Sequence, residues 1–118
     1  MSTQTTGNYG EDLACEYIQK LGFVILKRNY RIRGGEIDIV ARDGDTLVFV
    51  EVKARFSHKF GLPVEAITFW KLKALLKTAQ FYILETKWNG LYRLDFVSVD
   101  FTKNRNNPAL ELIKNITI

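Results

Sequence analysis

Apolar residues near the N-terminus recur at the spacing of a helix that buries one face. The positions that carry this pattern are Leu13, Ala14, Tyr17, Ile18 and Leu21. They predict an amphipathic helix over residues 8–21, with Asn8 as its N-cap, Glu11 as the partner in a capping box and Gly22 as the C-terminal stop. Residues 1–7 show no such periodicity, so we expect a flexible tail followed by one domain over residues 8–118.

Three strand patterns follow this helix. Residues 22–31 begin apolar and turn basic, which predicts a first strand. Residues 37–41 and 46–52 are rich in Ile and Val and flank a turn with an Asp-Gly pair, which predicts an antiparallel hairpin. We expect a symmetric register in which Ala41 faces Thr46.

The second half of the chain returns to helical spacing and then to alternation. Residues 68–84 predict a second helix, and residues 91–100 and 109–118 predict two more strands. The order αβββαβ plus a last strand predicts an α/β fold with a mixed sheet of about five strands flanked by helices. Because the second helix connects the strand at 46–52 to the next one, these two strands should pair in parallel.

Composition and charge narrow the classes of function. The 118 residues include one cysteine, Cys15, and one histidine, His58, so an intramolecular disulfide is impossible. The same counts argue against a multi-cysteine zinc site and a Ser-His-Asp triad. We find no apolar run long enough to span a membrane and no signal peptide, so we expect a cytoplasmic protein without a membrane partner. A net charge of +4 and a pI of about 9.3 suggest a polyanionic partner.

Acidic residues collect at one end of the predicted hairpin. Side chains alternate along a strand, so Glu51 and Lys53 share one face. The expected register places Glu36 opposite Glu51 and Asp38 opposite Phe49, so Asp38 lies diagonal to Glu51 at roughly 7 to 8 Å. Two carboxylates at this separation can close onto a divalent cation such as Mg²⁺. The alternative is a surface ion-pair cluster in which Lys53 and nearby arginines neutralise the acids.

The first helix adds one more acid to this end of the molecule. Glu11 lies at the margin of the buried face, beside Ala14 and Ile18. Its carboxylate can reach over the sheet edge to the same cation, or it can pair with Asn8 in the capping box. Both roles can hold at once.

The acidic residues belong to a longer pattern. The run GGEIDIVARDGDTLVFVEVKAR, with Gly10 and Glu11 upstream and Lys71 downstream, resembles the YraN family of small bacterial proteins over residues 8–99. That family in turn resembles the PD-(D/E)XK nucleases, closest to the archaeal Holliday-junction resolvases. The resemblance implies a restriction-endonuclease-like αβββαβ core.

The resemblance also implies roles for individual residues. Asp38 and Glu51 would hold Mg²⁺ or Mn²⁺, which polarises the phosphodiester and lowers the pKa of an attacking water. Lys53 would orient that water or offset developing charge, and Glu11 would complete the metal shell or serve a second ion. Ile37 stands where the motif has its proline. The resolvase relatives imply a homodimer.

Basic residues lie on both sides of the acids along the chain. We expect contacts to nucleic acid from Arg31, Arg33, Arg55, Lys59 and Lys71. Glu36 is expected to pair with a basic residue. We interpret Phe69 and Trp70 as helix packing rather than as base-stacking platforms, and Cys15 as a core residue.

Two functional hypotheses follow from these patterns. The first is a Mg²⁺-dependent endonuclease that hydrolyses phosphodiester bonds of branched or structured DNA. The second is a non-catalytic nucleic-acid-binding or assembly protein that retains the nuclease fold. The first is favoured because Asp38, Glu51 and Lys53 are all present, whereas a retired nuclease is expected to have lost one of them. A third class, a protein-interaction domain without nucleic acid, would need a large exposed apolar patch.

Overall fold

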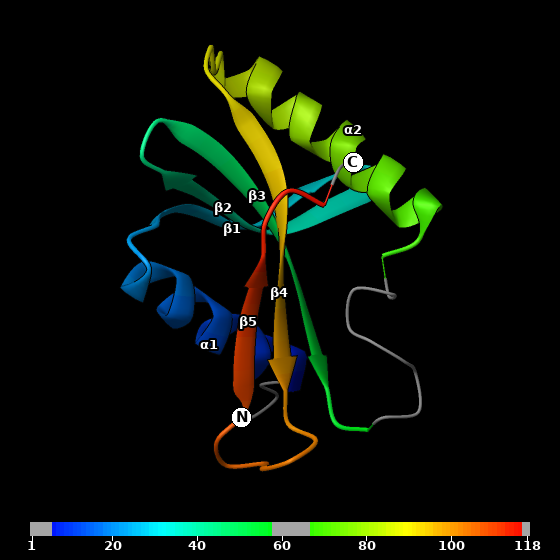
Figure 1. Cartoon of the computed structure of the whole chain (residues 1–118). Helices are drawn as coiled ribbons and strands as arrows, with labels where there is room; N and C mark the ends of the chain where they lie inside the picture. The colour runs from blue at the N-terminus through cyan, green and yellow to red at the C-terminus, as the bar shows by residue number, and fades with distance from the viewer. Residues whose placement is uncertain (1–5, 58–66, 117–118) are drawn as a thin grey trace.

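The helices and strands follow the order that the hydrophobic pattern predicts. The computed structural model describes residues 6–57 and 67–116. Its elements are α1 (Thr6–Lys20), β1 (Val24–Ile32), β2 (Gly35–Asp43), β3 (Thr46–Arg55), α2 (Phe69–Thr86), β4 (Tyr92–Asp100) and β5 (Ala109–Ile113). The five strands form one twisted sheet, with α1 and α2 packed against opposite faces (Figure 1). The α/β class and the five-stranded mixed sheet are confirmed.

Alternation along the strands divides the core into two layers. The layer between α1 and the sheet contains Ala14, Cys15, Ile18, Phe23, Ile39, Ala41, Val48, Val50, Val97, Val99 and Phe101. The layer between α2 and the sheet contains Ile37, Val40, Leu47, Phe49, Leu75, Ala79 and Leu94. Leu47 and Phe49 of β3 therefore face α2, and Glu51 continues this face at the end of the apolar run. The prediction that Cys15 is a core residue is confirmed.

The strand order is β1-β2-β3-β4-β5, and the central strand, β3, pairs in parallel with β4. β3 pairs with β4 in parallel and places Glu51 beside Phe96, whereas the other neighbours pair antiparallel. This result confirms the parallel crossover through α2. The acidic end of β3 consequently lies in the middle of the sheet, between β2 and β4.

The register of the β2–β3 hairpin corrects the expected one by two residues. Asp43 faces Thr46, so Ala41 pairs with Val48 instead of Thr46. The loop has only two residues, and Gly44 takes its first position with a φ of +60°, which a glycine adopts without strain. A shift of two residues keeps every side chain on its expected face. Continued beyond the pair Ile39 and Val50, this register brings Asp38 level with Glu51 rather than diagonal to it.

The ends and exposed faces of the helices also differ from expectation. α1 begins at Thr6, so Asn8 lies inside the helix and is not its N-cap. α2 begins one residue later than predicted, with Thr68 as its N-cap. Phe69 and Trp70 are expected to pack within the fold, but their exposed fractions of 65% and 74% show that they do not pack against the sheet. Within the described parts of the chain, neither helix combines the length and apolar character needed to cross a membrane.

Candidate functional site

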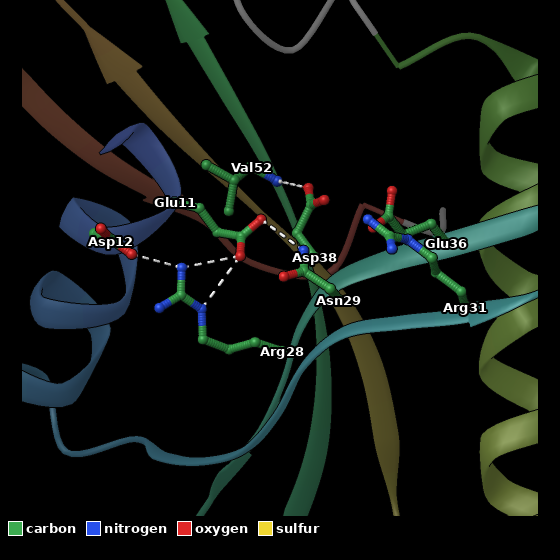
Figure 2. A network of polar contacts seen from close by, with 8 residues as sticks. All are labelled: Glu11, Asp12, Arg28, Asn29, Arg31, Glu36, Asp38 and Val52. Carbon is green, nitrogen blue, oxygen red and sulfur yellow. Dashed lines mark hydrogen bonds and ion pairs between the residues drawn. The ribbon is translucent and has the colours of Figure 1, made fainter. Parts of the chain in front are cut away.

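Two carboxyl groups meet where β2 and β3 leave the apolar core. Glu51 is buried on β3, and Asp38 is half-buried on β2. The backbone N–H of Val52 donates to Asp38 Oδ2 at 2.8 Å, which fixes the Asp38 carboxyl against β3 (Figure 2). The register of the hairpin places the Glu51 side chain next to Asp38 on the same face of the sheet. The structure therefore brings together the two residues that the sequence assigns to a metal.

The surroundings of Asp38 favour its protonated form. Burial, and then the negative charge of Glu51, raise the pKa of Asp38 to about 7. The N–H of Val52 lowers this pKa, while the neighbouring Glu51 side chain and the charge of Glu11 raise it further. At neutral pH Asp38 is therefore divided between its protonated and ionised forms. A divalent cation in place of the proton would remove the repulsion, so the donor set fits a hard cation such as Mg²⁺.

A kink in β1 shapes the edge of this site. β1 and β2 pair through Arg28 with Ile39 and through Tyr30 with Ile37, but the residue between them, Asn29, has a φ of +53°. Asn29 stands opposite Asp38 in this ladder. Its left-handed backbone turns the side chain out of the regular pleat, and its Nδ2 donates to Glu11 Oε2 at 3.0 Å.

Glu11 reaches this end of the sheet, but its carboxylate is held by β1. Arg28 donates to Glu11 Oε1 through Nε at 3.2 Å and Nη2 at 3.0 Å, and Asn29 donates to Oε2 (Figure 2). Arg28 also bonds Asp12 at 2.7 Å. No three acidic, His or Cys side chains among the described residues gather around one point. Glu11 acts on Asp38 through its charge, and its role as a metal ligand stays a prediction.

Gly10 explains why α1 can place Glu11 here. Gly10 is buried, and a Cβ at this position would lie 3.0 Å from the Cβ of Ala54 on β3. Such a contact is tighter than ordinary van der Waals contact, so a larger residue would require α1 or Ala54 to shift by a few tenths of an ångström. The close approach of α1 to β3 therefore depends on glycine beside the acid.

The lysine next to the carboxyl pair is not the one that strand alternation indicated. Lys71 of α2 places its Nζ 3.2 Å from Glu51 Oε2. Lys53 is exposed and forms no ion pair with any residue in the described part of the chain. The position of Lys71 was readable from helical spacing, because it precedes the buried Leu75 and Thr78 by four and seven residues. It therefore lies on the face of α2 that meets the sheet.

The other basic residues lie around the site at different depths. Arg31 is exposed and pairs with Glu36 at 2.8 Å, which confirms the expected partner for Glu36 (Figure 2). Arg33 is exposed at the β1–β2 turn. Arg55 is half-buried, and its carbonyl accepts from the N–H of Phe101. Lys59 lies outside the described residues.

Comparison with known proteins places this geometry in a family. Residues 10–99 match the family described as "Uncharacterised protein family UPF0102". A UPF0102 protein of Caldicellulosiruptor saccharolyticus is 44% identical over 116 residues, which cover 98% of each chain. A UPF0102 protein of Clostridium botulinum is 43% identical over 111 residues, which cover 92% of this chain and 90% of the relative. The matched region contains both carboxyl groups, Glu11 and Lys71, and the chain belongs to the UPF0102 (YraN) family.

Proposed function

We propose that this protein is a metal-dependent endonuclease that hydrolyses phosphodiester bonds in branched or structured DNA. The observation that carries the proposal is the pair of carboxyl groups of Asp38 and Glu51, which the hairpin register brings level at the edge of the core, where burial and their proximity raise the pKa of Asp38. Burying two acids side by side is costly unless a cation or a proton is available to the pair. Such an arrangement is typical of a site that binds a divalent ion.

Asp38 and Glu51 would hold the ion, with water and DNA phosphate oxygens as further ligands. When bound, Mg²⁺ or Mn²⁺ would polarise the scissile phosphate and make an attacking water more acidic. The hydrogen bond from Val52 to Asp38 orients one ligand in advance. Glu11, kept in place by Arg28, holds a negative charge near the pair that strengthens its attraction for cations.

Two lysines support the chemistry from different sides. Lys71 contacts Glu51, and because its side chain is 43% exposed it can also meet a DNA phosphate. Lys53 is exposed two residues beyond Glu51, where an ammonium group can orient a water or offset charge that develops on the phosphate. Arg31 and Arg33 extend the positive surface along β1.

The function also implies a setting and an assembly. A nuclease acting on chromosomal DNA has to work in the cytoplasm of a bacterial cell, as the single buried thiol of Cys15 also suggests. A symmetric branched substrate presents two equivalent strands, so paired cuts require two active sites. The homodimer therefore stays part of the proposal, and sedimentation with and without DNA tests it.

The decisive experiment is cleavage of labelled DNA. A four-way junction, a linear duplex and a single strand are incubated with the protein in Mg²⁺, in Mn²⁺ and in chelator. We expect incision of the junction that requires metal and that Asp38→Asn and Glu51→Gln both abolish. Asp45→Asn is the matched control, because Asp45 is an exposed acid in the turn of the same hairpin.

The alternative is a binding or assembly protein without turnover. The same positive surface would support it, since phosphate contacts need no metal. Junction binding without incision, in both metals and at protein excess, would replace the nuclease proposal with this alternative. Cleavage that persists at the wild-type rate in Asp38→Asn would assign the activity to another site or to a contaminant.

A further inference from the structure

The N-terminal turn of α2 presents an exposed aromatic pair. Phe69 and Trp70 have exposed fractions of 65% and 74%, and their ring centroids are 5.3 Å apart at an interplanar angle of 73°. Large aromatic side chains with this exposure lose the stabilisation that burial would give them. Single exposed apolar residues are common, but an adjacent pair on one helical turn indicates a contact surface.

Positive charge surrounds this aromatic pair. Lys73 places its Nζ 5.4 Å from the Phe69 centroid and 5.6 Å from the Trp70 centroid. Lys77 follows one turn later, and the only acidic residue in α2 is Glu85, near its other end. The pair thus lies in a field that attracts anions, and aromatic faces next to lysines suit a ligand with both flat rings and phosphates.

A groove continues the surface on the side of Phe69. It encloses about 450 Å³ and is lined by Phe69, Leu72, Ile113 and Lys114, among others. Its walls combine apolar side chains with a lysine, just as Lys73 lies beside the aromatic pair. The groove therefore extends the same chemistry from α2 to the segment that follows β5.

We propose that Phe69, Trp70 and Lys73 form a platform for unpaired bases of DNA. A base stacks on the Trp70 or Phe69 ring while Lys73 and Lys77 contact the flanking phosphates. Fully paired DNA cannot use such a platform, because its bases are already stacked on one another. Within α2 the single acid, Glu85, lies near the other end of the helix, so a protein partner would find no acidic residue on this turn of α2 to pair with its own cations, and the charge favours a polyanion.

The platform would define the substrate class of the proposed nuclease, and to that extent it rests on the proposed function. Trp70 adjoins Lys71, which contacts Glu51, so the platform begins at the residue next to the lysine that meets the carboxyl pair. Unpaired nucleotides held there would enter the site next to the scissile bond. We therefore expect flaps and splayed arms to be preferred over uninterrupted duplex.

Binding in chelator tests the platform separately from cleavage. The probes are a labelled twelve-nucleotide thymidine strand and a twelve-base-pair duplex, titrated with the protein at low salt and followed by fluorescence anisotropy. Trp70→Ala should weaken binding of the single strand by roughly tenfold and that of the duplex by less than about twofold, since stacking contributes only to the first. Trp70→Tyr should keep most of the affinity, because it keeps a flat ring.

Leu84→Ala is the matched control, because Leu84 has an exposed fraction of 75% on the same helix but lies near its other end, away from Lys73 and Lys77. It should leave both affinities unchanged. The platform is rejected if Trp70→Ala binds the single strand as wild type does, if it weakens both probes equally, or if wild type binds neither. It is also rejected if wild type is a dimer in sedimentation and Trp70→Ala is not, since the face would then be an interface between two copies.

These outcomes are independent of the nuclease assay. If Trp70→Ala loses single-strand binding and wild type incises DNA in no metal, the platform is supported and the nuclease proposal is rejected. If wild type incises DNA in a metal-dependent way and Trp70→Ala binds the single strand normally, the nuclease proposal is supported and the platform is rejected.

Discussion

Acids on the three neighbouring strands β2, β3 and β4 form two sites in the sheet, and the protein neutralises the two sites in different ways. Asp95 of β4 is fully buried and accepts hydrogen bonds from Arg93 Nε at 3.0 and 3.1 Å, and from the backbone N–H of Asn115 at 2.9 Å. Asp38 of β2 instead accepts one backbone hydrogen bond and faces a second carboxyl group, that of Glu51. Asp95 is therefore paired with an arginine, whereas Asp38 lies next to another acid.

The two sites also differ in what they connect. Asp95 lies beside Val50 on the α1 face of the sheet, and Arg93 extends from it to Asp43 at 2.8 Å. This bridge ties the β2–β3 hairpin to β4. Burial alone would lower the pKa of Arg93, but the hydrogen bonds to the two acids outweigh it and raise this pKa. The Arg93 cluster is electrostatically complete, whereas the Asp38–Glu51 pair gains from a further cation.

The largest expected effect concerns the incomplete pair. Asp38→Ala should reduce metal-dependent incision by more than about a hundredfold, since it removes an ion ligand and leaves transition-state charge unbalanced. Calorimetry should show that Mg²⁺ binding is lost as well. Lys53→Ala should lower the incision rate but keep Mg²⁺ binding, because an ammonium group is not a metal ligand. Unchanged Mg²⁺ binding in Asp38→Ala would mean that the two acidic sites differ less than we infer.

Substitutions in the Arg93 cluster should change the stability of the protein rather than its activity. Asp95→Ala leaves Arg93, whose side chain is only 18% exposed, with Asp43 as its remaining acidic partner. We expect the free energy of unfolding to fall by about 3 to 5 kcal/mol, as for other broken buried ion pairs. Urea denaturation measures it. Asp45→Asn, in the exposed turn, should change it by less than about 0.5 kcal/mol. Equal effects of both variants would contradict a structural role for the Arg93 cluster.

The pH dependence of stability separates the two sites further. The pKa of Asp38 is about 7 in the folded state and 3.8 in a model peptide, so between these values the folded state binds the extra proton. The free energy of unfolding should therefore fall as pH rises from about 4 to 7, by at most about 4 kcal/mol, because one pKa unit corresponds to about 1.4 kcal/mol. Urea denaturation at pH 5 and pH 8 in chelator measures this loss.

Asp38→Asn supplies the control for the pH experiment, since it cannot ionise. The variant should lose less stability than wild type between pH 5 and pH 8, and it should be the more stable of the two at pH 8. Added Mg²⁺ should stabilise wild type at pH 8 and not the variant, because only the ionised pair binds the cation. The same slope in both proteins would show that Asp38 ionises without cost.

Much of this fold can be predicted from the sequence, because alternation and helical spacing report which face of each element is buried. The parallel pairing of β3 and β4 follows from the helix between them. The register of the hairpin does not follow, since it depends on which residue of the turn takes the positive φ. Gly44 takes the first loop position, and the resulting shift moves Asp38 from a diagonal to a level position beside Glu51.

The site is only half predictable for a similar reason. Asp38 and Glu51 can be paired because both lie on strands of one hairpin, where spacing is regular. The partners of Glu11 cannot, because they depend on the left-handed backbone of Asn29 and on the docking of α1 against β1. The contact of Lys71 with Glu51 likewise depends on how α2 docks, although its spacing from the buried residues of that helix was a usable signal.

The smallest expected effect concerns the exposed arginines near the Asp38–Glu51 pair and tests whether they contact DNA. Arg31 is 70% exposed and its ion pair with Glu36 is open to solvent, so the pair contributes little to stability and leaves the guanidinium available to a phosphate. Arg31→Ala should lower the slope of log affinity for duplex DNA against log salt concentration by about 0.9, the value for one lost phosphate contact. Filter binding at several salt concentrations measures the slope. Lys20→Ala, at the far end of α1, should leave it unchanged. If Arg31→Ala and Arg33→Ala both keep the wild-type slope, DNA does not bind along β1, and Arg31 would only neutralise Glu36, as Arg93 neutralises Asp95.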